Sequence, residues 1–435
     1  MKIILFVIFI LCTNVLLNAQ NITTVDSIGC FDIGMAAFDT YGNLYFESGL
    51  GNKIMKMDTN YVTSVVAGTG SIGYSGDNGP ATNATIDVPG GITVDTIGNV
   101  YFADSYNQRV RKIDVSTGII TTIAGIGIGG IGTGGFSGDG GPASAAQLNV
   151  PLGVCFDKLG NLCIVDGSNY RIRKITTDGI INTIVGNGVE GLTSGDDGPA
   201  TAARCYPADI VADNFGNIFF TQPLSTIRKV NSLGIISTIA GDTISHIYNG
   251  DGIPATSANI DPYCIAMGVD GLLYISDAST NNRIRVIDLA GIIHTAAGNG
   301  ISGNGGDSGP ATAAEFYGNT GIAFDKCGNL FIGQVNDPRI RKVSFNPACW
   351  PEEVNKIPTY EINIYPNPAI TEINVNNITS ETNYAVFNIV GIIEQSGTLE
   401  KGSNSINIKA LPPALYLLEL TDEDGRRTVR KVVKE

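Results

Sequence analysis

Five loops of one composition carry the carboxylates that are best placed for chemistry in this chain. Each loop has a Gly-Asp pair and, three residues after the Asp, a Pro-Ala pair. Carboxylate oxygens are ligands that calcium prefers, and they also bind polar ligands at a protein surface. The candidate ligand-binding carboxylates are Asp77, Asp139, Asp196, Asp251 and Asp307.

The loops have features that favour an architectural role over a metal site. Each loop offers only one or two carboxylates, and none has the D-x-[DN]-x-[DN]-G spacing of a calcium loop. A Gly-Asp-x-Gly segment forms a tight turn, and the Pro can open a short Ala-rich helical turn. We therefore expect no metal and no cofactor, with calcium as the alternative.

Other residue types give little support for catalysis. The chain has two histidines, His246 and His294, which lie in different parts of the sequence pattern described below, so a histidine-ligated metal site is not expected. No G-x-S-x-G nucleophile motif is present. The net charge of −14 and the isoelectric point near 4.6 exclude nucleic acid as a partner, because no basic surface is available to bind phosphates.

The start of the chain resembles a secretory signal. Met1 and Lys2 precede an apolar run from residue 3 to residue 17, and Ala19 offers a cleavage site. The run is shorter than the roughly 20 residues that span a bilayer. We expect a signal peptide over residues 1–19 and no transmembrane anchor in the mature chain.

Removal of that signal leaves seven cysteines, so at least one thiol is free or paired between chains. None has metal-type spacing. Cys155 and Cys163 flank a turn, and a hairpin there places them opposite each other, where a disulfide can form. Two buried thiols are the alternative that the sequence leaves open.

A repeat with three alternating segments organises most of the chain. A turn glycine marks six copies, and the successive spacings are 56, 62, 56, 55 and 57 residues. Each copy supplies four short strands, except that the sixth ends at Val343 without the last one. The mature N-terminus, Ile22-Thr23-Thr24-Val25, matches that missing strand. The six marker glycines are Gly42, Gly98, Gly160, Gly216, Gly271 and Gly328.

A four-stranded sheet with two apolar faces must stack on its neighbours, and the borrowed N-terminal strand closes the stack into a ring. The sequence therefore predicts an all-β fold, with a six-bladed β-propeller over residues 21–346. Five loops of one design then project from one rim of the ring. The turns between the second and third strands lie at the same rim, and they add the candidate ligand-binding residues Tyr106, Asn107, Asn169 and Tyr170.

The repeat resembles NHL-repeat propellers. The shared residues are Gly-Asn followed by an apolar and an aromatic residue, and then Asn-x-Arg-Ile/Val-Arg-Lys, as in Gly98–Phe102 and Asn107–Lys112. The first and fourth copies depart from this pattern, because Lys53 and Met55 replace both arginines of the first copy and Thr226 replaces one arginine of the fourth.

The tail has a different periodicity. Short strands over residues 361–435 predict a small Ig-like β-sandwich, joined to the propeller by a linker over residues 347–360. The tail resembles the C-terminal sorting domain of type IX secretion cargo, which implies delivery to the outer surface of a Gram-negative bacterium or release from it. The residues that carry this resemblance include Tyr365, Pro366, Asn367, Pro368, Lys431 and Lys434.

These observations predict an exported, non-catalytic propeller that binds a protein or a glycan through its inter-blade loops. Its second expected partner is the type IX secretion machinery, through the C-terminal domain. The alternative is a calcium-dependent propeller enzyme of the lactonase or lyase type.

Overall fold

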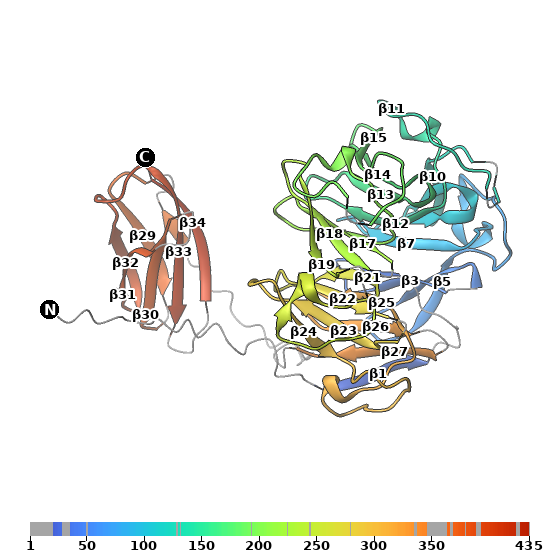
Figure 1. Cartoon of the computed structure of the whole chain (residues 1–435). Coiled ribbons are helices and arrows are strands. Elements are labelled where there is room, and N and C mark those ends of the chain that lie inside the picture. The colour runs from blue at the N-terminus through green and yellow to red at the C-terminus, as the bar shows by residue number, and fades with distance from the viewer. Residues whose placement is uncertain are drawn as a thin grey trace. The chain divides into compact units, whose positions relative to one another are not determined.

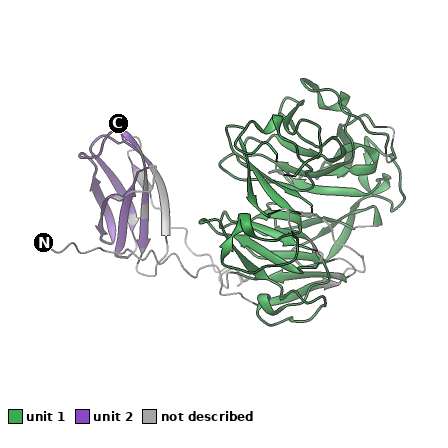
Figure 2. Cartoon of the chain, viewed as in Figure 1, with its two compact units in different colours: residues 1–349 green, residues 350–435 purple. Residues whose placement is uncertain are grey.

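The computed structural model describes residues 21–27, 35–48, 51–127, 129–130, 132–192, 194–223, 225–242, 245–278, 280–334, 337–345, 363–365, 369–378, 380–388, 393–422 and 427–434. The expected signal peptide and linker lie outside these residues, and the predicted domain limits stay predictions. Contacts divide the chain into two compact units, residues 1–349 and residues 350–435 (Figure 2). No helix in the described part is long and apolar enough to cross a membrane.

The first unit is a ring of six antiparallel sheets, called here blades one to six (Figure 1). Each blade has four main strands in the order of the sequence, and the first strands of neighbouring blades contact one another in a closed cycle. The main strands of blades one to three are β2 (Ala36–Phe38), β3 (Leu44–Glu47), β4 (Ile54–Met57), β5 (Thr63–Ala67), β7 (Pro89–Val94), β8 (Val100–Asp104), β9 (Arg109–Ile113), β10 (Ile119–Ala124), β12 (Pro151–Phe156), β13 (Leu162–Asp166), β14 (Arg171–Ile175) and β15 (Ile180–Val185). Those of blades four to six are β16 (Ile210–Ala212), β17 (Ile218–Gln222), β18 (Thr226–Val230), β19 (Ile236–Ala240), β21 (Pro262–Met267), β22 (Leu273–Asp277), β23 (Arg283–Ile287), β24 (Ile292–Ala297), β25 (Asn319–Phe324), β26 (Leu330–Gln334), β27 (Asp337–Val343) and β1 (Ile22–Ser27).

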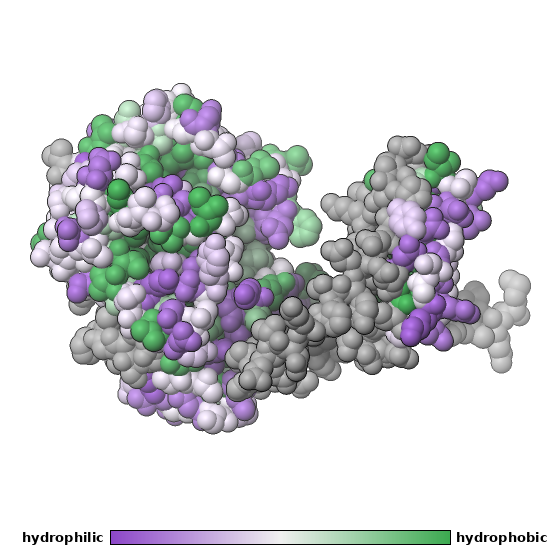
Figure 3. Space-filling view, turned by 180° about the vertical axis from the view of Figure 1, so that it is seen from behind, coloured by the Kyte–Doolittle hydropathy of each residue, from purple (hydrophilic) through white to green (hydrophobic). Residues whose placement is uncertain are grey.

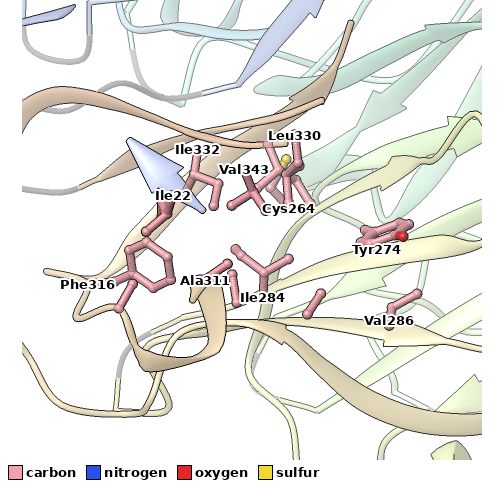
Figure 4. Close-up of a cluster of buried hydrophobic side chains, with 14 of the residues drawn as sticks. Ile22, Cys264, Tyr274, Ile284, Val286, Ala311, Phe316, Leu330, Ile332 and Val343 are labelled. Atoms are coloured by element: carbon pink, nitrogen blue, oxygen red, sulfur yellow. The ribbon is translucent and has the colours of Figure 1, made fainter. Parts of the chain in front are cut away.

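The N-terminal strand closes the ring, as predicted from the strand that the sixth copy lacks. β1 pairs with β27 in antiparallel register, with Ile22 opposite Val343. Figure 1 shows the blue β1 beside the orange β27. The side chain of Ile22 is fully buried in a cluster with Phe316 and Ala311 (Figure 4).

Six apolar clusters hold the blades together, one at each blade-to-blade interface. Each cluster takes side chains from the facing surfaces of two sheets. Alternation along a strand sends successive side chains to opposite faces, so each middle strand contributes to two interfaces. In β8, for example, Phe102 packs toward blade one and Ala103 toward blade three.

Each Gly-Asp loop wraps the blade that follows it. The Pro of the loop pairs with the fourth strand of that blade, or with the turn before it, as in β6 (Gly79–Pro80), β11 (Gly141–Pro142) and β20 (Ile253–Pro254) and in the bridges Pro199 to Ile235 and Asn21 to Pro310. A one-turn 3-10 helix follows every one of these prolines, which confirms the expected Ala-rich turn. The turns are η2 (Ala81–Asn83), η4 (Ala143–Ala145), η6 (Ala200–Ala202), η7 (Ala255–Ser257) and η8 (Ala311–Ala313).

The second unit packs two sheets around one apolar cluster. One sheet has the order β28 (Asn363–Tyr365), β29 (Glu372–Ile378), β32 (Gly402–Asn407), and the other β31 (Ile393–Leu399), β30 (Thr382–Phe387), β33 (Ala414–Asp422), β34 (Arg427–Lys434). The sequence pattern missed β31. It is an edge strand with mostly exposed side chains, so it lacks the apolar alternation that marks the others.

Replacing Ile22 by Ala in the full chain tests the ring closure. The smaller side chain leaves a cavity where β1 seals blade six, so the free energy of unfolding falls by about 2–5 kcal/mol. Urea unfolding measures it. The neighbouring exposed Thr23, changed to Ala, serves as the control and changes stability by less than about 0.5 kcal/mol. Equal losses for the two variants would contradict a closing role for β1.

Candidate functional site

The third strand of each of blades two to six carries one fully buried arginine. These side chains are too large and too strongly charged to be buried without a partner. The two terminal nitrogens make the contacts described below, and none of the five Nε atoms has a hydrogen-bond partner in the described part of the chain. The five residues are Arg111, Arg173, Arg228, Arg285 and Arg341.

The partner of each arginine is the Asp of the preceding loop. Arg111 lies 2.7 Å from Asp77, and Arg285 lies 2.9 Å from Asp251. The same Nη2 atom also donates to a loop carbonyl, for example that of Ser75 at 3.0 Å. The other three pairs are Arg173 with Asp139, Arg228 with Asp196, and Arg341 with Asp307.

A second carboxylate completes the arrangement in three blades. Asp104 lies 3.1 Å from Arg111, and its other oxygen accepts the backbone N–H of Asp87 at 2.8 Å. Asp166 and Asp277 have the same two contacts in blades three and five. Burial raises the pKa of Asp104 and of Asp166 to about 6, against the opposing effect of the arginine. The strand-end Asp residues of these three blades therefore pair with arginine.

In blades four and six a glutamine stands at this position. Gln222 accepts the backbone N–H of Tyr206, and Gln334 accepts that of Tyr317, each at 3.0 Å. An amide oxygen therefore holds the loop as the carboxylate does, without adding a second negative charge beside the arginine.

The other arginine of the motif stacks on a loop aromatic residue. Arg109 lies 3.6 Å from the ring centre of Tyr74, and Arg171 and Arg283 lie 3.9 Å from those of Phe136 and Tyr248. In blade four, Thr226 replaces this arginine and Thr193 stands at the loop position of the aromatic. The sequence shows this joint loss in blade four, although blade six keeps Arg339 with Asn304 at the same loop position.

The loop carboxylates that were predicted from the sequence to bind a ligand thus face arginines. A cation such as calcium would have to displace a guanidinium from each of them. Of the nominated amides, Asn107 is buried and donates to Asp104 and to the carbonyl of Gly73, and Asn169 makes the equivalent pair of contacts. Ligand binding at these residues stays a prediction.

Tyr106 and Tyr170 are half-exposed, and three further tyrosines lie at the same rim. Tyr206 and Tyr317 are tied to the ends of β17 and β26, and Tyr263 follows Pro262, which pairs with the end of β22. Tyr206 is 40% exposed, Tyr317 is 42% exposed and Tyr263 is 48% exposed. The rings of Tyr170 and Tyr206 lie 5.9 Å apart. We call these five residues the tyrosine collar. The sequence analysis did not predict Tyr206, Tyr263 or Tyr317, although each of them lies just before or at the start of the first strand of a blade.

A cavity of about 210 Å³ lies where the first strands of all six blades meet. Among its described lining residues, Asp209 alone carries a charge. Its carboxylate accepts the N–H of Ile265 at 2.8 Å, and the nearby thiol of Cys264 and N–H of Ile210 act to lower its pKa. Burial raises the pKa of Asp209 to about 6.

Cys155 and Cys163 are directly opposite each other in β12 and β13, as the hairpin predicted. Both are buried free thiols in this structure. Contact with the Cys163 thiol and burial raise the pKa of Cys155. The disulfide stays a prediction.

No group of three or more His, Cys, Asp or Glu residues that could hold a metal occurs among the described residues. His294 contacts Asp288 at 3.1 Å on β24, while His246 lies in the loop before blade five.

In the tail, Tyr365 is exposed on β28, and its hydroxyl accepts the Asn376 amide at 2.6 Å. Lys431 and Lys434 lie on β34, where Lys434 is buried. Pro366, Asn367 and Pro368 lie outside the described residues.

Comparison with known proteins agrees with this architecture. Residues 37–128 and 133–194 match the Teneurin NHL domain, and residues 363–435 match the Secretion system C-terminal sorting domain. Human Teneurin-1 is 29% identical over 52% of this chain and 9% of its own length. The chloroplastic protein Suppressor of Quenching 1 of Arabidopsis thaliana is 27% identical over 72% of this chain and 30% of its own length. The chain thus spans less than a third of either relative.

Solved structures share the fold. A protein of unknown function from Bacteroides thetaiotaomicron superposes with a TM-score of 0.53 and 18% identity over 75% of this chain and 76% of its own. An auxiliary nutrient binding protein from the same organism gives a TM-score of 0.53 and 16% identity over the same shares. The first unit is therefore an NHL-repeat β-propeller. The second is a type IX secretion sorting domain, which marks the chain as a protein exported to the cell surface or secreted.

Replacing Arg111 by Met tests the ion pairs. The change leaves Asp104 buried without its cation, so the free energy of unfolding falls by about 3–5 kcal/mol. Chemical denaturation measures it. Lys112, the half-exposed next residue, changed to Met is the control, and adding Asp104→Asn to the first variant recovers part of the loss. An unstable double variant would show that the pair is not the cause.

The pKa of Asp209 predicts how stability changes with pH. An Asp carboxyl in the unfolded chain has a pKa of 3.8, so the folded protein binds more protons between about pH 4 and 6. The stabilisation by the protonated form is complete below about pH 4 and is lost as the pH rises through about 6.

Asn at position 209 cannot titrate. The free energy of unfolding of Asp209→Asn, relative to that of the unchanged protein, therefore rises by about 2–3 kcal/mol between pH 4 and pH 7. Urea denaturation across this range measures the difference. Parallel curves for the two proteins would refute the raised pKa.

Proposed function

We propose that this exported propeller binds a glycan at its loop rim, through the tyrosine collar. The collar supports the proposal because five tyrosines from five blades lie at one rim, three of them with 40–48% of their surface exposed. Tyrosine rings offer a flat apolar face together with a hydroxyl, which suits sugar rings with their apolar faces and peripheral hydroxyls.

The rest of the rim supplies rigidity. The backbone beside Tyr206 and Tyr317 is fixed by Gln222 and Gln334, and the Ser105 hydroxyl next to Tyr106 donates to the Pro151 carbonyl of the following blade at 2.6 Å. Rings that are held in place before binding lose little conformational entropy when a ligand arrives. The visible face of the molecule mixes hydrophilic and hydrophobic residues (Figure 3).

Two alternatives have less support. The calcium-dependent enzyme needs carboxylates that are free to ligate, whereas each loop Asp faces an arginine. A protein ligand would use the same rim. One structural neighbour is an auxiliary nutrient binding protein, which agrees with capture of a nutrient, but at 16% identity it shares only the fold with this chain.

A glycan array followed by calorimetry with the best glycan tests the proposal. Replacing Tyr206, Tyr263 or Tyr317 by Ala weakens binding about three- to tenfold each, because a stacked ring contributes about 0.5–1.5 kcal/mol. Phe215, which is 79% exposed in the turn between β16 and β17 at the opposite rim, is the matched control, and Phe215→Ala leaves the affinity unchanged. An equal loss with this control, or capture of a surface protein but of no glycan, would overturn the glycan proposal.

A further inference from the structure

The carboxyl of Asp209 occupies a position where the repeat does not need one. Gly91 and Gly153 stand at the equivalent places of blades two and three. A Cβ on Gly91 would lie 2.7 Å from the Cα of Gly153, and a Cβ on Gly153 would lie 2.9 Å from that of Asp209. The first strands are therefore tightly packed at this level, and the fold forms in those blades without any side chain there.

The hydrogen bonds of Asp209 do not explain why this residue is an Asp and not a neutral Asn. It joins blade four to blade five by accepting the N–H of Ile265, which the oxygen of a neutral Asn could accept equally. Its described partners are two N–H groups and one thiol. An ionised carboxylate has about four acceptor positions, so one stays available.

Asp209 also differs from three other buried Asp residues at this end of the blades. Asp104, Asp166 and Asp277 each face an arginine. No cation is among the described contacts of Asp209 or among the described residues that line its cavity. A buried charge without an opposite charge is costly, and a cation beside it in a low-dielectric site is strongly favoured.

The cavity has the size and lining for an apolar stem. Its volume of about 210 Å³ is several times the roughly 30 Å³ that one water occupies. Met35, Phe38, Met267 and Phe324 line it together with aliphatic side chains. Aromatic rings and thioether groups in such walls favour a cation that carries hydrocarbon over a hydrated metal ion.

We propose that the axial cavity is a binding site for a small primary amine, whose ammonium group pairs with Asp209 while its short aliphatic stem fills the apolar part. The site is separate from the tyrosine collar, and the proposal does not depend on glycan binding.

The test compares n-butylamine with n-butanol, which has the same stem and no charge. At neutral pH we expect n-butylamine to bind the full chain in calorimetry and to raise its melting temperature. We expect n-butanol to do neither. Asp209→Asn weakens amine binding at least about tenfold, as expected for the loss of one charge pair. Thr93→Val, a second change in the cavity lining that leaves the carboxyl in place, retains amine binding and shows that the cavity tolerates substitution.

A crystal soaked with 3-bromopropylamine locates the ligand by its bromine signal. Bromine in the axial cavity supports the proposal. Bromine only at the collar, equal binding of butanol and butylamine, undiminished binding by Asp209→Asn, or no binding of the amine would each overturn it. Glycan binding by the Asp209→Asn variant is measured in parallel, so that a failure of the glycan-binding proposal is distinguished from a failure of the amine-binding proposal.

Discussion

An arginine buried in the third strand and paired with a carboxylate from the preceding loop is the interaction on which blades two to six depend. The loop must leave the outer edge of one blade, wrap the next and return to the axis to begin its first strand. Nothing in the short Gly-rich segment would fix that path by itself. The buried guanidinium donates hydrogen bonds to both the loop carboxylate and a loop backbone carbonyl, so it fixes the position of the loop. The strand that follows therefore starts at a defined level of the ring.

The exceptions among the blades follow from the same electrostatics. Blade one has Met55 where the others have the buried arginine, and the sequence before it has no Gly-Asp loop. An arginine without its loop would be a buried charge without a partner, so the two features are present or absent together. Gln222 and Gln334 in blades four and six keep the hydrogen bond to the loop and omit one charge. The scaffold thus tolerates variation as long as each buried arginine keeps its loop carboxylate.

Residues that repeat around the ring have a role in the fold, and residues that break the repeat are the candidates for function. The loop carboxylates recur five times and face arginines. The tyrosine collar lies in blades two to six with no strict period, and Asp209 occurs once. Both features lie near the ends of the first strands, where six chain segments approach the axis. A propeller places the collar tyrosines at one rim, although successive ones lie 36 to 64 residues apart in the sequence.

The blade, the number of blades, the borrowed strand β1 and the separate tail were predictable from the sequence, because glycine turns, apolar alternation and strand counts are local or periodic properties. The sequence also placed Cys155 opposite Cys163, since a hairpin register follows from its turn. It did not reveal β31, whose exposed edge position removes the alternation that marks a strand. The folded ring was needed to show that Asp77 and its counterparts face arginines some 34 residues away, and that Asp209 lines an axial cavity with no cation among its described lining residues. Those facts depend on which segments of different blades meet, and the contact between them is set by closure of the whole ring.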